Sequence, residues 1–329
     1  MKLKNLEFLG PVFIIAGLLV SRYLFPNKIT FFTEISIYTI YVMGNNILMG
    51  YMGYTSFGQP FYLSCGAYSA AIYLAYIGGN VFVAIFVAFL VGLLLSFILG
   101  PSLMRLKGSY FTLINASLCA IGVFMFERLL IDITNGNDGL WYRSNMHKTP
   151  LLDIRMPQNY FFFILIVLLA ALYLYRKIDR SALGTVLKAA STNPRKMRFL
   201  GYNVFRIRWM AFTISVVFST IAGALYSVNF GFVNPSLGEN SRAIEVLLAT
   251  LIGGIGTVYG PFFGALGFLG MKDFVSSFLS RWEFVVGIMT LIVLFKFNRG
   301  LWGMIQDAGS FLADTGRKFK NNSVKTAEK

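Results

Sequence analysis

The sequence contains few of the residues that enzymes use to bind metals or to transfer protons. It has one histidine, His147, and two cysteines, Cys65 and Cys119, which both fall inside apolar stretches. One histidine cannot supply a His/Cys metal cluster, and cysteines in such stretches are typical of small buried residues rather than of a disulfide. The GxxxxGK[ST] phosphate loop, the GxSxG elbow and the HExxH zinc motif do not occur. We therefore expect a protein that is not an enzyme and that has no cofactor or metal of its own.

Charged residues are also scarce, and apolar residues predominate. Charged residues are 13% of the chain, hydrophobic residues are 56%, and the mean hydropathy is +0.66. A bilayer core of ~30 Å takes roughly 20 helical residues to cross. The stretches are apolar throughout rather than alternating, which favours helices over barrel strands. The sequence predicts an all-α polytopic membrane protein with about ten transmembrane helices, some short or glycine-broken, near 8–25, 33–50, 60–77, 81–99, 109–131, 159–175, 209–230, 243–256, 261–279 and 283–297.

The net charge of +15 does not indicate a nucleic-acid-binding protein, because the basic residues are confined to a few loops and the tail. The segment 176–208 holds nine basic residues and one acid, Asp179. Basic loops stay on the cytoplasmic side of membranes, so we expect cytoplasmic N- and C-termini. We divide the chain into a transmembrane domain, 1–308, with its loop 176–208, and a polar cytoplasmic tail, 309–329. We expect the first helix to be retained, since no small-residue cleavage site follows it.

Two glycine-rich stretches, 50–61 and 253–265, lie about 200 residues apart and suggest a weak internal repeat. Each joins two apolar segments and ends in Gly-x-Pro-Phe or Gly-Pro-Phe. Interrupted membrane helices in corresponding halves indicate a transport pathway, although glycines also simply permit close helix packing. We favour the pathway, and assign to it Gly53, Tyr54, Ser56, Phe57, Gly58, Gln59, Gly253, Gly254 and Gly256.

Glu127 is a further candidate for the pathway, near the outer end of the fifth predicted helix. Intramembrane charges are costly and usually face protein or water. Glu127 could meet a substrate ammonium group. It could equally form a structural ion pair or reach the interface, and this choice stays open.

The basic loop contains a predicted short helix. Asn193 is a suitable N-cap, Pro194 suits the first helical position, and Gly201 can end the helix. Met197 and Leu200 are expected to share an apolar face with Arg195, Lys196 and Arg198 around it. Such a helix can dock into a groove on a soluble partner. The alternative is a basic loop that only contacts anionic lipid.

Several motifs, in order over about residues 40–305, are similar to those of LivM-type permeases of branched-chain amino-acid ABC importers. They are NNILMGYMGYTSFGQPFYLSCGAY at 45–68, LKGSYF at 106–111, TNGNDGL at 134–140, LGYNV at 200–204 followed by AFTIS at 211–215 and AGALY at 222–226, and GGIGTVYGPFFGA at 253–265. The sister LivH-type subunit has an Asn-Phe-Ala-His-Gly version of the first motif, which this chain lacks.

The resemblance implies a permease of the bacterial cytoplasmic membrane. Its partners would be a second permease subunit (LivH-like) or a second copy of itself, two cytoplasmic ATPases that use Mg-ATP, and an extracytoplasmic solute-binding protein. The loop around Ala189–Gly201 would be the coupling helix that receives the motion of the ATPase.

Two alternatives remain for the function. Importers of urea and short-chain amides share the same motifs. An ion-coupled secondary transporter would also have broken helices, but it is expected to carry a carboxylate at mid-depth, and the clear carboxylates here lie near helix ends.

Overall fold

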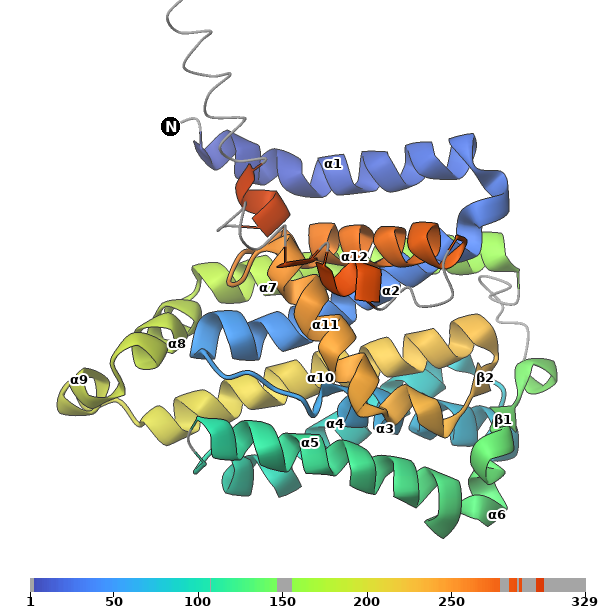
Figure 1. Ribbon diagram of the computed structural model, residues 1–329, viewed down its shortest axis with the longest axis horizontal. Helices are drawn as coiled ribbons and strands as arrows, with labels where there is room; N and C mark the ends of the chain where they lie inside the picture. The colour runs from blue at the N-terminus through green and yellow to red at the C-terminus, as the bar shows by residue number, and fades with distance from the viewer. Residues whose placement is uncertain are drawn as a thin grey trace, which may run out of the picture.

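The computed structural model describes residues 3–106, 108–146, 156–278, 284–288, 290–291 and 300–304. His147, most of the predicted helix 283–297 and the tail 309–329 lie outside these residues. The described chain is almost entirely helical, as the sequence predicts (Figure 1). In chain order the helices are α1 (Leu3–Leu24), α2 (Ile29–Asn46), α3 (Gln59–Ile72), α4 (Val81–Leu103), α5 (Ser109–Phe124), α6 (Ile131–Thr134), α7 (Pro157–Arg180), α8 (Ala182–Thr192), α9 (Pro194–Phe199), α10 (Val204–Phe230), α11 (Asn240–Gly253) and α12 (Gly260–Ser276).

Each predicted membrane helix up to 261–279 has a counterpart in the described residues. By length and composition, α4, α5 with the turn that follows it, α7 and α10 can each cross a bilayer. Helices α2, α3 and α5 continue without a break into single π-helical turns, Ile47–Tyr51, Tyr73–Ile77 and Met125–Leu129. The sequence did not predict α8, and it ended α7 five residues early, because charged residues continue α7 beyond its apolar run.

Helix α4 shows how the sequence sets the packing. Asn80 caps it by accepting a hydrogen bond from the backbone N–H of Phe82 at 3.0 Å. Small residues recur every four positions and form one buried stripe, which consists of Ala84, Ala88, Gly92, Ser96 and Gly100. The stripe faces α10, and the indole N–H of Trp209 on α10 donates to the Ser96 carbonyl at 3.0 Å. Small residues let two helices approach closely, so this stripe determines which face of α4 is buried.

Helix α10 lies at the centre of the described structure, in contact with α2, α3 and α4 (Figure 1). Gly66 on α3 and Gly223 on α10 each face the backbone of the other helix with no room for a side chain. The two backbones are therefore in direct contact over this stretch. This arrangement makes α3 and α10 the closely packed core around which the other helices are placed.

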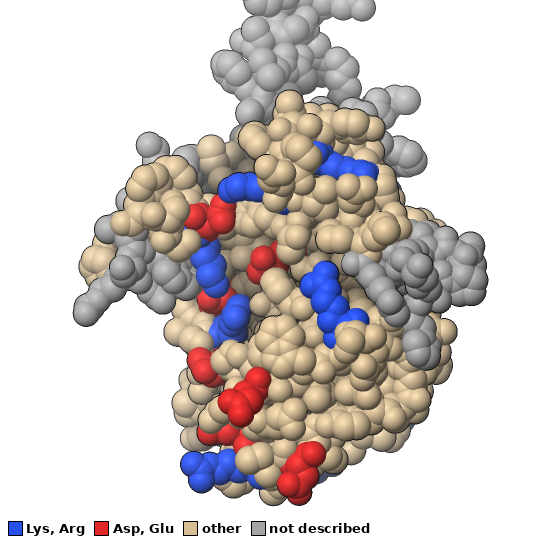
Figure 2. Space-filling model, turned by 90° about the vertical axis from the view of Figure 1, so that its right-hand side faces the viewer, with Lys and Arg blue, Asp and Glu red and all other residues tan. Residues whose placement is uncertain are grey.

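The two ends of the molecule differ (Figure 1). At one end, which we call the α8–α9 end, lie α8, α9 and the N-terminal end of α1. At the other, the hairpin end, β1 (Leu140–Trp141) pairs antiparallel with β2 (Phe232–Val233), with Leu140 opposite Val233. Figure 2 looks onto the hairpin end and shows basic and acidic side chains interspersed over it.

Candidate functional site

The first glycine-rich stretch interrupts a helical path. After the π-helical turn Ile47–Tyr51 the chain is non-helical over 53–58, and it runs from the α8–α9 end into the middle of the molecule before α3 begins (Figure 1). Non-helical backbone at membrane depth has to be satisfied by protein or by a water-filled cavity. Here α5 supplies some of the hydrogen-bond partners of this backbone. The hydroxyl of Thr112 donates to the Thr55 carbonyl at 2.9 Å, and the thiol of Cys119 donates to the Phe57 carbonyl at 3.1 Å.

The contacts of Gly58 and Gln59 explain the residue type at each of these two positions. Gly58 faces Asn115, on the same side of α5, with no space for a side chain. Gln59 is fully buried and bridges two hydroxyls of α10, since it donates to Ser215 at 2.9 Å and accepts from Ser219 at 2.5 Å. The structure thus places the predicted residues of this stretch together between α5 and α10.

The second glycine-rich stretch has a different structure. It forms the turn between two short helices, α11 and α12, at the α8–α9 end (Figure 1). Gly253 packs against the backbone of Gly260 and Gly264. Close packing therefore accounts for Gly253, and its assignment to a pathway, with Gly254 and Gly256, stays a prediction.

Asn46, four residues before the first stretch, bonds to the second stretch. Its carbonyl oxygen accepts from the backbone N–H of Gly256 at 2.8 Å, while its amide donates to the Thr257 carbonyl at 3.0 Å and to the Tyr175 hydroxyl at 2.7 Å. Beside it, Gly50 leaves no room for a side chain against Gly256. Asn46 thus ties α2 to the α11–α12 turn and to α7.

Glu127 is not brought to either stretch. It lies on the turn Met125–Leu129 at the far end of α5, and its carboxylate accepts a hydrogen bond from the Asn137 amide at 2.9 Å. Twelve residues separate it from Asn115, which is ~18 Å along a helix. Its structural partner is therefore a loop residue at the hairpin end, and a role toward substrate stays a prediction.

A charged cluster lies where α2, α11 and α12 meet, and the sequence analysis assigned it no role. Glu245 pairs with Lys272 at 2.9 Å and with Arg242 at 3.5 Å. Glu34 lines the same small cavity as Arg242 and Glu245, and that cavity measures about 20 Å³. The cluster could have been found by searching every apolar segment for charges of both signs, because intramembrane charges are usually paired.

Two tyrosines line the same cavity. The hydroxyls of Tyr38 and Tyr41 are buried and have no hydrogen-bond partner among the described residues. The cavity has room for about one water molecule. A single water held there would satisfy both hydroxyls.

The loop predicted to couple to a partner has the expected caps. Asn193 accepts from the backbone N–H of Lys196 at 3.0 Å, and Pro194 takes the first position of α9. Gly201 has a φ of +83°, a conformation that favours glycine. The N–H of Gly201 bonds to the Arg198 carbonyl at 3.0 Å and that of Tyr202 to the Met197 carbonyl at 3.0 Å, which is a Schellman ending. The predicted short helix and its glycine stop are confirmed.

The predicted apolar face of this helix is wrong in one respect. Met197 is buried, and it packs with Ala190 and Val204 in a small cluster of its own that half-buried Ala189 also contacts. Leu200 is 72% exposed and Phe199 is 91% exposed. The reason is that α8 and α10 fold back on either side of α9 and cover Met197. The exposed apolar surface is Phe199 and Leu200, flanked by the exposed side chains of Arg195, Lys196 and Arg198.

Asp179 links the loop to the first stretch. Its Oδ1 accepts from the Tyr51 hydroxyl at 2.7 Å and from the Lys188 ammonium at 2.6 Å. Tyr51 is two residues before the non-helical segment, and Lys188 lies on α8. Asp179 therefore connects α8 to Tyr51, close to the break between α2 and α3.

These features define a polytopic helical membrane protein with an interrupted helix inside and a basic, partly apolar loop module at one end. The family model described as "Branched-chain amino acid transport system / permease component" matches residues 27–294. The chain belongs to this permease family.

Three relatives place the chain more closely. It is 25% identical to the high-affinity branched-chain amino acid transport system permease protein LivM of Salmonella typhimurium, over 92% of this chain and 76% of the relative. It is 25% identical to the LivH permease protein of the same kind of system in Escherichia coli, over 57% of this chain and 63% of the relative. It is 29% identical to the autoinducer 2 import system permease protein LsrC of Yersinia enterocolitica, over 55% of this chain and 51% of the relative. No solved structure matches the chain.

Proposed function

We propose that this chain is the membrane permease subunit of an ABC importer that carries branched-chain amino acids into a bacterial cell. The observation that carries the proposal is the match of the branched-chain permease family to residues 27–294. The chain also covers 76% of the LivM permease protein of Salmonella typhimurium and 68% of that of Escherichia coli. This coverage supports the same substrate class. Neither a urea importer nor an ion-coupled transporter has comparable support.

The partners follow from the same proposal. A second permease subunit, LivH-like or a second copy of this chain, would complete the transmembrane body, two ATPases would supply the energy, and a solute-binding protein would deliver the substrate. The chain has no phosphate loop of its own, which agrees with ATP hydrolysis on a separate subunit.

The α8–α9 module is the proposed contact with the ATPases. Phe199 and Leu200 present an exposed apolar surface ringed by basic side chains, which suits docking into an apolar groove with an acidic rim. Under this proposal the α8–α9 end, and with it the N-terminal end of α1, would lie in the cytoplasm. The excess of positive charge in 176–208 supports that orientation.

Transport would follow from movement of the module relative to the interrupted helix. ATP binding on the partners would shift α8 and α9, and the Asp179 contacts to Lys188 and Tyr51 would carry this shift to the segment 53–58. That segment and Glu127 both adjoin α5, whose other face exposes Tyr110, Leu113 and Phe124. We propose that the second permease subunit covers this face and that the pathway runs between the subunits.

The direct test is uptake of labelled leucine by cells with and without this chain. Loss of uptake on deletion, unaffected by excess urea and by a protonophore at clamped ATP, is expected. Unchanged leucine uptake would contradict the proposed substrate, and autoinducer 2 and urea would be tested next. A collapse of uptake caused by the protonophore at constant ATP would contradict the ABC mechanism.

A further inference from the structure

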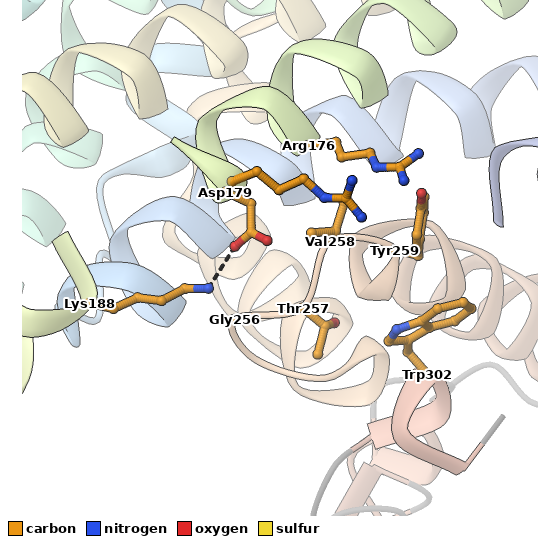
Figure 3. A pocket seen from close by; sticks show the side chains of 9 residues that line it. Arg176, Asp179, Lys188, Gly256, Thr257, Val258, Tyr259 and Trp302 are labelled. Atoms are coloured by element: carbon orange, nitrogen blue, oxygen red, sulfur yellow. Dashed lines mark hydrogen bonds and ion pairs between the residues drawn. The ribbon is translucent and has the colours of Figure 1, made fainter. Parts of the chain in front are cut away.

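A pocket of about 160 Å³ opens at the α8–α9 end (Figure 3). Four parts of the chain enclose it: the last turn of α7, α8, the α11–α12 turn and the short helical piece around Trp302. The lining residues are Arg176, Asp179, Arg180, Lys188, Gly256, Thr257, Val258, Tyr259 and Trp302. The volume is several times the ~30 Å³ share of one water molecule in the liquid, so the pocket can admit a group as large as a phosphate.

The lining carries more positive than negative charge. Among the described residues, the lining has three cationic side chains and one carboxylate, a formal surplus of two positive charges. That carboxylate, Asp179, is already bonded to Lys188 at 2.6 Å and to Tyr51 at 2.7 Å. The pocket is therefore electrostatically suited to an anion.

The opposite wall is aromatic. The rings of Tyr259 and Trp302 are both buried, and their centroids lie 5.0 Å apart in an edge-to-face arrangement. Figure 3 shows Arg176 and Tyr259 directed toward the same space, with Trp302 below them. Because both rings are buried, they form a fixed apolar wall beside the cationic side chains.

We propose that this pocket binds a phosphate-bearing anion, and that the phosphate is supplied by the headgroup of an anionic phospholipid or by free phosphate. Guanidinium groups present paired N–H donors that match phosphate oxygens, and basic pockets between membrane helices bind anionic headgroups. The bound phosphate bridges α7, α8 and the α11–α12 turn. It thereby fixes the position of α8, independently of which solute the protein carries.

The test uses the purified full-length protein in detergent and counts bound lipid by native mass spectrometry. Phosphatidylglycerol is compared with phosphatidylcholine, and inorganic phosphate is tested separately by thermal shift. In detergent there is no charged membrane surface, so a one-to-one complex reports a site rather than general attraction. Arg176→Gln/Arg180→Gln is expected to lower the affinity for the anion about tenfold or more, as the loss of charge-assisted hydrogen bonds does.

The matched control is Arg195→Gln/Arg198→Gln, which removes two cations from α9, in the same basic segment but outside the pocket lining. This control is expected to change the affinity less than about twofold. If the first pair fails to fold, Arg180→Gln alone serves, because Arg180 is exposed. Saturable binding of phosphatidylglycerol but not phosphate identifies the lipid as the source, and the reverse identifies free phosphate. Equal loss in both double variants, or saturable binding of neither anion, would overturn the proposal.

Discussion

At the scale of single residues, Asn46 connects three parts of the chain through its side-chain hydrogen bonds. It is fully buried and bonds three groups, on α7 and on the α11–α12 turn. Its neighbour Asn45 is equally buried but makes one side-chain bond, to Thr250 at 2.7 Å. The pair offers a comparison between two adjacent asparagines of the same helix.

We predict that Asn46→Ala destabilises the protein clearly more than Asn45→Ala. Each buried polar group left unsatisfied costs roughly 1–3 kcal/mol, and Asn46→Ala leaves more of them. Thermal unfolding of the two variants in the same detergent measures the difference. Equal melting temperatures would show that the contacts of Asn46 add nothing beyond burial.

At the scale of elements, the α8–α9 module separates two roles within six residues. Met197 belongs to the internal packing of the module, whereas Phe199 and Leu200 face outward. A substitution at Met197 therefore tests folding of the module, and one at Phe199 or Leu200 tests its contact with a partner.

We predict that Phe199→Asp and Leu200→Asp each reduce leucine uptake at least about tenfold, because each places a charge in an apolar contact. The amount of protein in the membrane should stay at the wild-type level, since both side chains are exposed. Uptake normalised to immunoblotted membrane protein is the measurement. Lys196→Gln is the control, and an effect of Lys196→Gln larger than that of Phe199→Asp would favour a loop that contacts only anionic lipid.

At the scale of the whole molecule, charged side chains from parts of the chain more than 200 residues apart lie together. The cluster of Glu34, Arg242, Glu245 and Lys272 lies where α2 meets α11 and α12. A second pair, Lys28–Asp273 at 2.8 Å, joins the start of α2 to α12, but its side chains are 55% and 49% exposed. The side chains of Lys272 and Glu245 are 28% and 14% exposed.

We predict that Glu245→Gln lowers the free energy of unfolding by on the order of 1–3 kcal/mol, less than the 3–5 kcal/mol of a fully buried pair. It removes the anion that two cations share. Lys28→Met, the exposed control, should cost under about 1 kcal/mol. Thermal unfolding again compares them, and a loss for Lys28→Met as large as that for Glu245→Gln would contradict a special role of the cluster.

Local sequence accounts for much of the fold. Long apolar runs determine the membrane helices, because a helix in lipid satisfies its backbone hydrogen bonds within its own segment. The caps Asn193 and Gly201 determine the ends of α9, because capping bonds join residues that are close in sequence. The glycine-rich stretches were also recognisable as interruptions. The sequence did not show that the two stretches differ in structure. The segment 53–58 lies along α5, whereas Gly253 packs between α11 and α12.

The sequence by itself therefore determined the class of protein, the family, the membrane helices up to 261–279 and the short helix α9. Only the tertiary structure decided that Met197 is covered and Phe199 exposed, that Asn46 bonds α2 to the α11–α12 turn, and that Arg176 shares a pocket with Trp302. These contacts join residues on different helices. Hydropathy and capping act over a few residues along the chain, whereas the face that a helix buries depends on which neighbour packs against it.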